Sequence, residues 1–379
     1  MWIPFTLLRK LSAPPYRPPP PLDEDAAAEF TLFRPFGKCL NVVHWRPTPL
    51  CAGAVEALIL GDSYADDIDM GFYAWPSKLA QLRSLACLNA ARGGAESRHV
   101  EFQYKHAKQF AQSHNLKLDG GTVCVVHAGG NDLLHGLWLG PLAALAIYAD
   151  IIAQLMAKLG LTRPITELPR FSFFGVATRQ TGRRLGGLVQ LLIENGHTRI
   201  LISGSPVCSQ VPTARFVVSL LLGAWIWPGG RDLVAHLIDA VAKVAQQQVF
   251  AFVQAASEAA CLATGRPSGS VEIVYFDEAA ALRTINAAAG ARPCWRDGHH
   301  PAEWVHAELA HAANRQLNET SRARSVAREG AARAPLEPRE TGGARRRRYS
   351  KIDTPPPGGG DGDAQQLCDQ EARRSCAIQ

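Results

Sequence analysis

Residues 58–63 read Leu58-Ile59-Leu60-Gly61-Asp62-Ser63, three apolar residues followed by a glycine, an acid and a serine. A short apolar run of this kind is typical of a parallel strand that helices cover on both faces. Glycine permits a tight turn after the strand. The run therefore predicts a strand that delivers Ser63 to the carboxyl edge of a sheet, where α/β proteins carry their chemistry.

Four further short runs of apolar or β-branched residues are also typical of strands. We expect five strands, at residues 56–60, 86–89, 122–127, 199–203 and 271–276. Apolar residues recur at helical spacing elsewhere, and the expected helices cover residues 75–82, 102–116, 137–161, 181–195, 232–260 and 302–316. This alternation predicts an α/β fold: a three-layer α/β/α sandwich around a five-stranded parallel sheet.

Composition divides the chain of 379 residues into three parts. Residues 1–54 form a proline-rich leader, which we expect to be largely unstructured because the run at 14–21 favours polyproline II. The leader is either a spacer or a ligand for a proline-binding module. Residues 55–318 hold the predicted strands and helices of one globular domain. Residues 319–379 are rich in Arg, Pro and Gly, so we expect a disordered tail.

The charge and the cysteines exclude several classes of protein. Half of the net charge of +6 comes from the tail, where twelve Lys and Arg residues oppose nine Asp and Glu residues. The remainder is close to neutral, unlike a nucleic-acid-binding domain. The nine cysteines show no CxxC pair or Cys/His ligand spacing, so we expect no metal and no other cofactor. Mostly reduced, buried thiols are the favoured interpretation, with one Cys39–Cys51 disulfide as the alternative.

A serine hydroxyl is a weak nucleophile unless a neighbouring base takes its proton. His300 is the candidate base, and Asp297 lies three residues before it, close enough to orient the imidazole ring. Acyl attack also creates an oxyanion that needs fixed hydrogen-bond donors. The candidates for this oxyanion hole are the backbone N–H groups of Ser63 and Gly94 and the side-chain amide of Asn131.

These residues occur as ordered blocks along the chain: Gly61-Asp62-Ser63 with Asp66, Asn89 with Gly93-Gly94, Gly130-Asn131-Asp132, and Asp297 with His300-Pro301. In this order the sequence resembles the GDSL, or SGNH, hydrolases over about residues 55–317. The resemblance implies a flavodoxin-like fold and a serine ester hydrolase, a GDSL-type esterase or lipase that forms an acyl-enzyme on Ser63. It assigns Ser63, Gly94, Asn131 and His300 as the name-giving residues, with Asp297 completing the triad.

The sequence departs from the family pattern at Tyr64, where the family name has leucine, and we expect this position to take no part in the chemistry. Two pairs of neighbours compete for one role each. Counting from Asn89, where its block starts, favours Gly94 over Gly93 as the glycine of the oxyanion hole. The spacing to the acid and the following proline favour His300 over His299.

Acidic residues near the serine invite two other interpretations. Asp62 could be taken for a catalytic acid, but beside the serine we expect it to bond loop amides. Asp66, Asp67 and Asp69 resemble a metal-ligand cluster, but no matching set of histidines accompanies them.

Residues 137–149 and 216–227 are two apolar segments that bear on the substrate. Each is either a buried core helix or a wall or lid for an acyl chain, and paired tryptophans in the second suit a membrane interface. Both favour an ester with an apolar acyl group. The alternative functions are O-deacetylation of a carbohydrate on the same fold and, more distantly, a catalytically silent, membrane-tethered binding protein.

The expected location is cytoplasmic, because the apolar start of the chain lacks the order of a secretory signal. No run reaches the roughly eighteen apolar residues of a spanning helix. The final Cys376-Ala377-Ile378-Gln379 fits a C-a-a-X prenylation box, with Arg373, Arg374 and Cys368 as further membrane signals. This predicts lipidation of Cys376 and tethering to the cytosolic face of a membrane. Secretion, which is common among proteins of the resembled family, is the alternative.

Overall fold

The computed structural model describes residues 29–33, 40–45, 53–132, 149–153, 155–157, 159–162, 168, 172–204, 209–212, 214–215, 230–267 and 269–333. The chain forms two compact units, Met1–Ala327 and Arg328–Gln379. The first unit contains the sheet and the candidate site. Of the second unit, the structure describes only residues 328–333, which end a helix.

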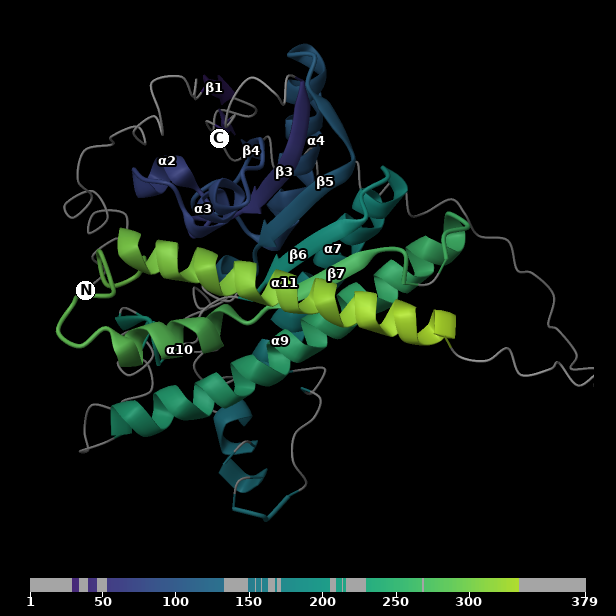
Figure 1. The fold of residues 1–379 in the computed structure, drawn as a ribbon. Coiled ribbons are helices and arrows are strands. Elements are labelled where there is room, and N and C mark those ends of the chain that lie inside the picture. The colour runs from purple at the N-terminus through teal and green to yellow at the C-terminus, as the bar shows by residue number, and fades with distance from the viewer. Residues whose placement is uncertain are drawn as a thin grey trace, which may run out of the picture. The chain divides into compact units, whose positions relative to one another are not determined.

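A seven-stranded sheet with the order β1-β2-β4-β3-β5-β6-β7 forms the centre of the first unit (Figure 1). Its five parallel strands are β3 (Ala54–Gly61), β4 (Cys87–Asn89), β5 (Lys117–His127), β6 (Arg199–Ser203) and β7 (Glu272–Phe276). Strand β5 begins earlier than expected, because Lys117 and Leu118 pair with the start of β3. The predicted α/β fold with five parallel strands is confirmed.

Two antiparallel strands extend the sheet beyond β4. Strand β1 (Glu29–Phe33) pairs with β2 (Leu40–Trp45), and β2 pairs with β4. Both strands lie in the segment expected to be an unstructured leader, so that expectation is wrong for these residues. The proline run ends at Pro21, before either strand begins, and the edge of β4 offers β2 unpaired backbone groups.

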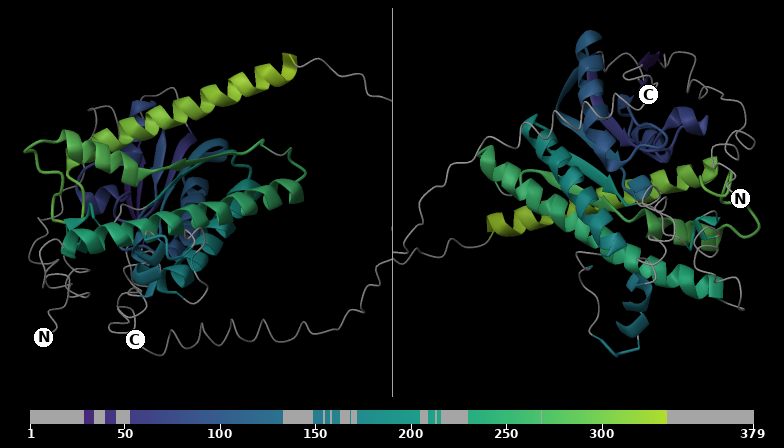
Figure 2. Two further views of the ribbon diagram at one scale, coloured as in Figure 1. Left: turned by 90° about the horizontal axis from the view of Figure 1, so that it is seen from below. Right: turned by 180° about the vertical axis from the view of Figure 1, so that it is seen from behind.

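Helices cover both faces of the parallel strands (Figure 2). On one face lie α4 (Ser97–Ser113), α7 (Phe173–Glu194) and α9 (Gly230–Ala263). On the other lie α3 (Trp75–Leu82), α10 (Glu278–Ala288) and α11 (Glu303–Arg333). A short helix, α2 (Asp67–Met70), follows the turn that contains Ser63.

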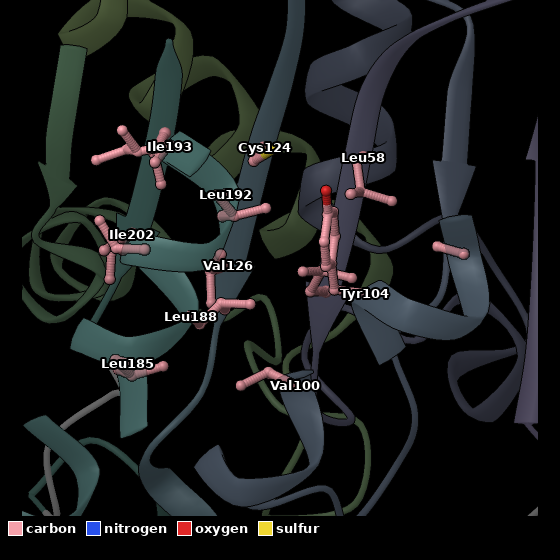
Figure 3. Close-up of a cluster of buried hydrophobic side chains, with 14 of the residues drawn as sticks. Leu58, Val100, Tyr104, Cys124, Val126, Leu185, Leu188, Leu192, Ile193 and Ile202 are labelled. Carbon is pink, nitrogen blue, oxygen red and sulfur yellow. The ribbon is translucent and has the colours of Figure 1, made fainter. Parts of the chain in front are cut away.

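The side chains of β3 show why the strand is apolar throughout. Leu58 and Leu60 are fully buried in the cluster beneath α4 and α7, which Figure 3 shows, whereas Ile59 is buried in the cluster on the opposite face. Successive side chains of a strand point to opposite faces, so a strand between two helical layers has no solvent-facing side. Each such leucine contributes about 2 kcal/mol by its burial.

Helices α7 and α9 pack closely because glycines remove side chains from the contact. A Cβ atom on Gly182 would lie 2.6 Å from Cδ2 of Phe252, and one on Gly186 would lie 3.1 Å from Cβ of Ala256. Small residues at a helix crossing let the two backbones approach.

Several helices differ from the expectations, and among them α4 covers Ser97–Ser113 instead of residues 102–116. Helix α7 begins at Phe173 instead of 181, because the Ser172 hydroxyl caps it by accepting from the N–H of Gly175. Helix α10 was not expected; Asp277 caps its start in the same way. Helix α11 continues to Arg333, so the expectation of disorder from residue 319 is wrong for residues 319–333; the residues after 316 are mostly good helix formers.

Several expectations lie outside the described residues. They concern residues 137–148, the segment 216–227, the pair Cys39 and Cys51, and the tail beyond Arg333 with Cys368 and Cys376. Cys87, Cys124, Cys261 and Cys294 are free thiols. No helix within the described ranges has both the length and the apolar character needed to cross a bilayer.

Candidate active site

Residues 61–65, called the nucleophile turn below, begin where β3 ends. The amide side chain of Gln103 closes this strand end, because it accepts from the N–H of Gly61 (2.7 Å) and donates to its C=O (2.8 Å). Gly61 has a φ of +154°, and a Cβ atom there would overlap the carbonyl oxygen of His127. Only glycine fits this close approach of two backbones.

Asp62 stabilises the turn as expected, by bonding a loop amide. Its Oδ1 atom accepts from the N–H of Tyr64 (3.1 Å), and its C=O accepts from the N–H of Ala65 (3.0 Å). Asp62 is buried and also lies against His127, with 2.8 Å between Oδ1 and Nδ1. The sequence did not indicate this second partner.

Residues 294–301, called the base loop below, form a tight structure of their own. Trp295 and Pro301 make an antiparallel bridge, and the N–H of Arg296 donates to the C=O of His300 (2.8 Å). The Oδ1 atom of Asp297 accepts from the N–H groups of His299 (2.9 Å) and His300 (2.7 Å). The loop thus orders Asp297 and His300 before any contact with the nucleophile turn.

The structure brings Ser63, Asp297 and His300 together. The Nε2 atom of His300 lies 3.0 Å from Oγ of Ser63, and Nδ1 lies 2.8 Å from Oδ2 of Asp297. Partial burial would raise the pKa of Asp297, but its hydrogen bonds and charge interaction with His300 dominate and hold it well below its usual value. The carboxylate therefore stays ionised and fixes the tautomer in which Nε2 accepts the serine proton.

The loop after β4 carries the two candidate glycines and is tied to the nucleophile turn and to Asp66, which follows it. The N–H of Arg92 donates to the C=O of Gly61 (2.9 Å), and the N–H of Gly93 donates to Oδ2 of Asp66 (2.7 Å). The donor of Gly93 is thereby engaged. Gly94 follows with a φ of +78°, and apart from Gly94 and its two chain neighbours no atom of the described residues lies within 4 Å of the place where a Cβ atom would stand. Gly94 is therefore the better placed candidate donor.

Asn131 follows β5 and is joined to the same glycine loop. One N–H of its side-chain amide donates to the C=O of Ala95 (2.8 Å), which leaves the second for a substrate oxygen. Next to it, Asp132 accepts from the N–H (2.8 Å) and the hydroxyl (2.5 Å) of Ser97 at the start of α4. These bonds hold Gly94 and Asn131 in one assembly.

The acids near the serine serve the framework. The buried carboxylate of Asp67 accepts from the N–H of Ala74 (2.7 Å) and from the hydroxyl of Ser77 (2.7 Å). Burial raises the pKa of Asp67 from 3.8 to about 6, although these hydrogen bonds oppose the shift. Asn89 completes the network by donating to Ser77 (3.2 Å) and to the C=O of Ala65 (2.7 Å). In the described part of the chain, no group of three or more His, Cys, Asp or Glu residues is arranged to hold a metal ion.

Sequence reasoning missed a second set of polar residues behind the nucleophile turn. His127, Glu278 and Ser203 are almost fully buried there, at the end of β5, the start of α10 and the end of β6. Because their contacts join elements far apart in the chain, local spacing gives no signal for them. The one available signal was polar residues at the end of apolar strands.

A small cavity lies between α7 and α9 at the carboxyl ends of β5 and β6. Its volume is about 70 Å³, and its lining is mostly apolar, with Gly129, Ala245 and Val249 among the residues that form it. The hydroxyl group of Thr178 also lines the cavity, is buried, and has no hydrogen-bond partner among the described residues.

The register of the sheet relates this cavity to the serine. Gly61 of β3 pairs with His127 of β5. Ser63 and Gly129 each follow two residues later. Since paired strands lie about 4.8 Å apart, Ser63 and the Gly129 side of the cavity belong to the same edge of the sheet.

Comparison with known proteins adds no assignment. No protein-family model matches the sequence, and a search of curated proteins gave no match.

Proposed function

We propose that this protein is a serine ester hydrolase that forms an acyl-enzyme on Ser63. The observation that carries the proposal is the continuous chain of contacts from Ser63 to His300 (3.0 Å) and from His300 to Asp297 (2.8 Å). This order of nucleophile, base and orienting acid is the arrangement that activates a serine hydroxyl.

The reaction follows from these positions. Oγ of Ser63 attacks the acyl carbon of the ester while Nε2 of His300 takes the hydroxyl proton. The tetrahedral intermediate collapses, the bond to the leaving alcohol breaks, and His300 returns the proton to that oxygen. A water molecule then attacks the acyl-enzyme and loses its proton to His300; the bond between the acyl carbon and Oγ breaks, His300 returns the proton to Oγ of Ser63, and the carboxylic acid is released. Asp297 stabilises the charged imidazole in both halves.

Three donors are suited to the oxyanion of each tetrahedral intermediate. They are the N–H of Ser63, the N–H of Gly94 and the second amide N–H of Asn131. The bond from Asn131 to Ala95 fixes the amide before substrate binds, so little reorganisation is needed. Such donors lower the barrier because they are aimed at charge that appears only during the reaction.

The fold supports a more specific proposal, membership of the GDSL or SGNH hydrolases. The parallel strands follow the order β4-β3-β5-β6-β7, which is 2-1-3-4-5 when these five are numbered along the chain. This is the flavodoxin-like order, whose ligand sites lie at the switch point between the first and third strands. Ser63 follows β3 and Asn131 follows β5, the two strands at that point.

We further propose that the acyl group is short and apolar. An apolar cavity of about 150 Å³ accommodates a benzene ring, so the cavity of about 70 Å³ at the edge of the sheet has room for about three carbons.

The test combines a covalent probe with an ester substrate. A fluorophosphonate is expected to label Ser63, and p-nitrophenyl acetate is expected to give a burst of p-nitrophenol equal to the enzyme concentration. Ser63→Ala should abolish the label and lower kcat by about 10⁴-fold or more. Ser113→Ala is the matched control, because this exposed serine ends α4 and bonds only local groups. Hydrolysis that survives in Ser63→Ala at the rate of the control would contradict the proposal.

A further inference from the structure

The buried polar group behind the nucleophile turn contains two carboxylates and one histidine. Oδ1 of Asp62 lies 2.8 Å from Nδ1 of His127, and Oε2 of Glu278 lies 3.0 Å from Nε2 of the same ring. The hydroxyl of Ser203 donates to Oε2 of Glu278 (2.7 Å). Each of these four residues is at most 3% exposed, and Ser203 also lines the small cavity between α7 and α9.

The charge of His127 follows from these neighbours. Burial alone would lower the pKa of the imidazole, but the two carboxylates raise it well above its usual value. The two carboxylates therefore favour the charged form of His127, which lies between Asp62 and Glu278. The hydrogen bond between Nδ1 and Asp62 fixes the plane of the ring, and the charge contact of Nε2 with Glu278 lies on its other side.

Tyr64 lies on this plane. Its ring stacks on the ring of His127 with 5.3 Å between centroids and 8° between planes. A cation attracts the face of an aromatic ring at such a distance. Tyr64 is 4% exposed, and burial together with the nearby carboxylates raises the pKa of its hydroxyl well above 10, so the group remains a hydrogen-bond donor.

The hydroxyl of Tyr64 reaches the base loop. It donates to the C=O of His299 (2.7 Å), and the Tyr64 ring lies 5.9 Å from the ring of His300. Tyr64 directly follows Ser63 in the chain. One side chain thus joins the residue next to the nucleophile to the residue next to the base.

We propose that Tyr64 is a positioning residue, whose hydroxyl holds the base loop at hydrogen-bonding distance from Ser63. The stack on His127, which Asp62 and Glu278 enclose, keeps the Tyr64 ring in the orientation that this bond requires. The inference rests on the proposed ester hydrolysis for its effect on rate, whereas the contact itself is independent of any substrate.

Tyr64→Phe tests the inference, because it removes one hydroxyl and keeps the stacked ring. We expect kcat for p-nitrophenyl acetate to fall about tenfold with little change in KM, since a small displacement of a base lowers the rate of the chemical step. Hydrogen exchange of the amides of Arg296, His299 and His300 should accelerate about fivefold, because the bonds of these N–H groups lie within the base loop.

Tyr104→Phe is the matched control. Tyr104 is another buried tyrosine beside a histidine, with 3.3 Å between its hydroxyl and Nε2 of His197, but it belongs to α4 and is buried in the hydrophobic core. Its variant should lower stability without changing exchange in the base loop or kcat. If Tyr64→Phe exchanges like the wild type in the base loop, the inference is overturned, whatever the activity. If exchange in the base loop is slow in the wild type and faster in Tyr64→Phe, the inference is supported even when no ester is hydrolysed. A lack of ester hydrolysis would refute only the proposed function.

Discussion

The Nε2 atom of His300 lies 3.0 Å from Oγ of Ser63, although 237 positions separate the two residues in the chain. The contact joins the end of β3 to a loop that follows all five parallel strands. A serine hydroxyl is a weak nucleophile without a base, and the fold brings the partly buried imidazole of His300 to the position of one. The chemistry therefore depends on how the fold positions two separate loops.

His300 and His299 are adjacent, and the structure distinguishes their side chains. His300→Ala should lower kcat by about 10⁴-fold, because no other imidazole lies within reach of Ser63 among the described contacts. His299→Ala should keep kcat within about threefold, since the Tyr64 bond uses only the backbone C=O of His299. Steady-state hydrolysis of p-nitrophenyl acetate measures both. A larger loss in His299→Ala would reverse the assignment of the base.

The sequence alone predicted the parts of this site that depend on local spacing. Asp297 and His300 are three residues apart and bond within one loop, and the apolar run before Ser63 predicted the strand that carries it. The same reasoning could not predict β1 and β2, which become strands by pairing with the edge of β4.

The residues that connect the loops were also beyond sequence reasoning. Tyr64 was expected to take no part in the chemistry, and its contacts with His127 and His299, which come from two other elements, were not foreseen. His127 and Glu278 meet only because β5 ends and α10 begins at the same edge of the sheet. Contacts that arise from tertiary structure leave no periodic pattern in the chain.

A substitution at Gly61 tests the close approach of β3 and β5 at the nucleophile turn. Gly61→Ala places a methyl group on the carbonyl oxygen of His127 and at an unfavourable φ, so we expect a loss of about 2–4 kcal/mol in the free energy of unfolding. Urea denaturation gives this quantity. Gly187→Ala is the control: Gly187 lies in α7, no described atom lies within 4 Å of the added group, and the change should stabilise by about 0.5–1 kcal/mol. Equal stability of the two variants would contradict the close approach.

The raised pKa of Asp67 predicts that the stability of the folded protein depends on pH. Its pKa is about 6 in the folded protein and 3.8 without burial, so the folded state binds more protons between these values. The contribution of Asp67 to the free energy of unfolding should therefore be highest below about pH 4. It should fall by up to about 3 kcal/mol as pH rises through 6. Urea midpoints across pH 4–7 measure the slope, and Asp67→Asn should remove this part of it.

The acid Asp119 serves as the control for that experiment. It lies at the surface, where hydrogen bonds from Lys117 and Gly121 lower its pKa. Asp119→Asn should leave the slope between pH 4 and 6 as in the wild type. If Asp67→Asn retains the full slope as well, then another group carries it and Asp67 is ionised in the folded protein at low pH.

Filling the cavity tests the size of the acyl group. Ala245 is 5% exposed and lines the cavity from α9, so Ala245→Leu should occupy most of its volume of about 70 Å³. The ratio of kcat/KM for p-nitrophenyl butyrate to that for the acetate should fall about tenfold, because each methylene that loses an apolar site costs about 1–3 kcal/mol. Ala251→Leu adds the same atoms on the exposed side of α9 and should leave the ratio unchanged. A ratio that stays constant in both variants, with acetate still hydrolysed, would place the acyl group outside this cavity.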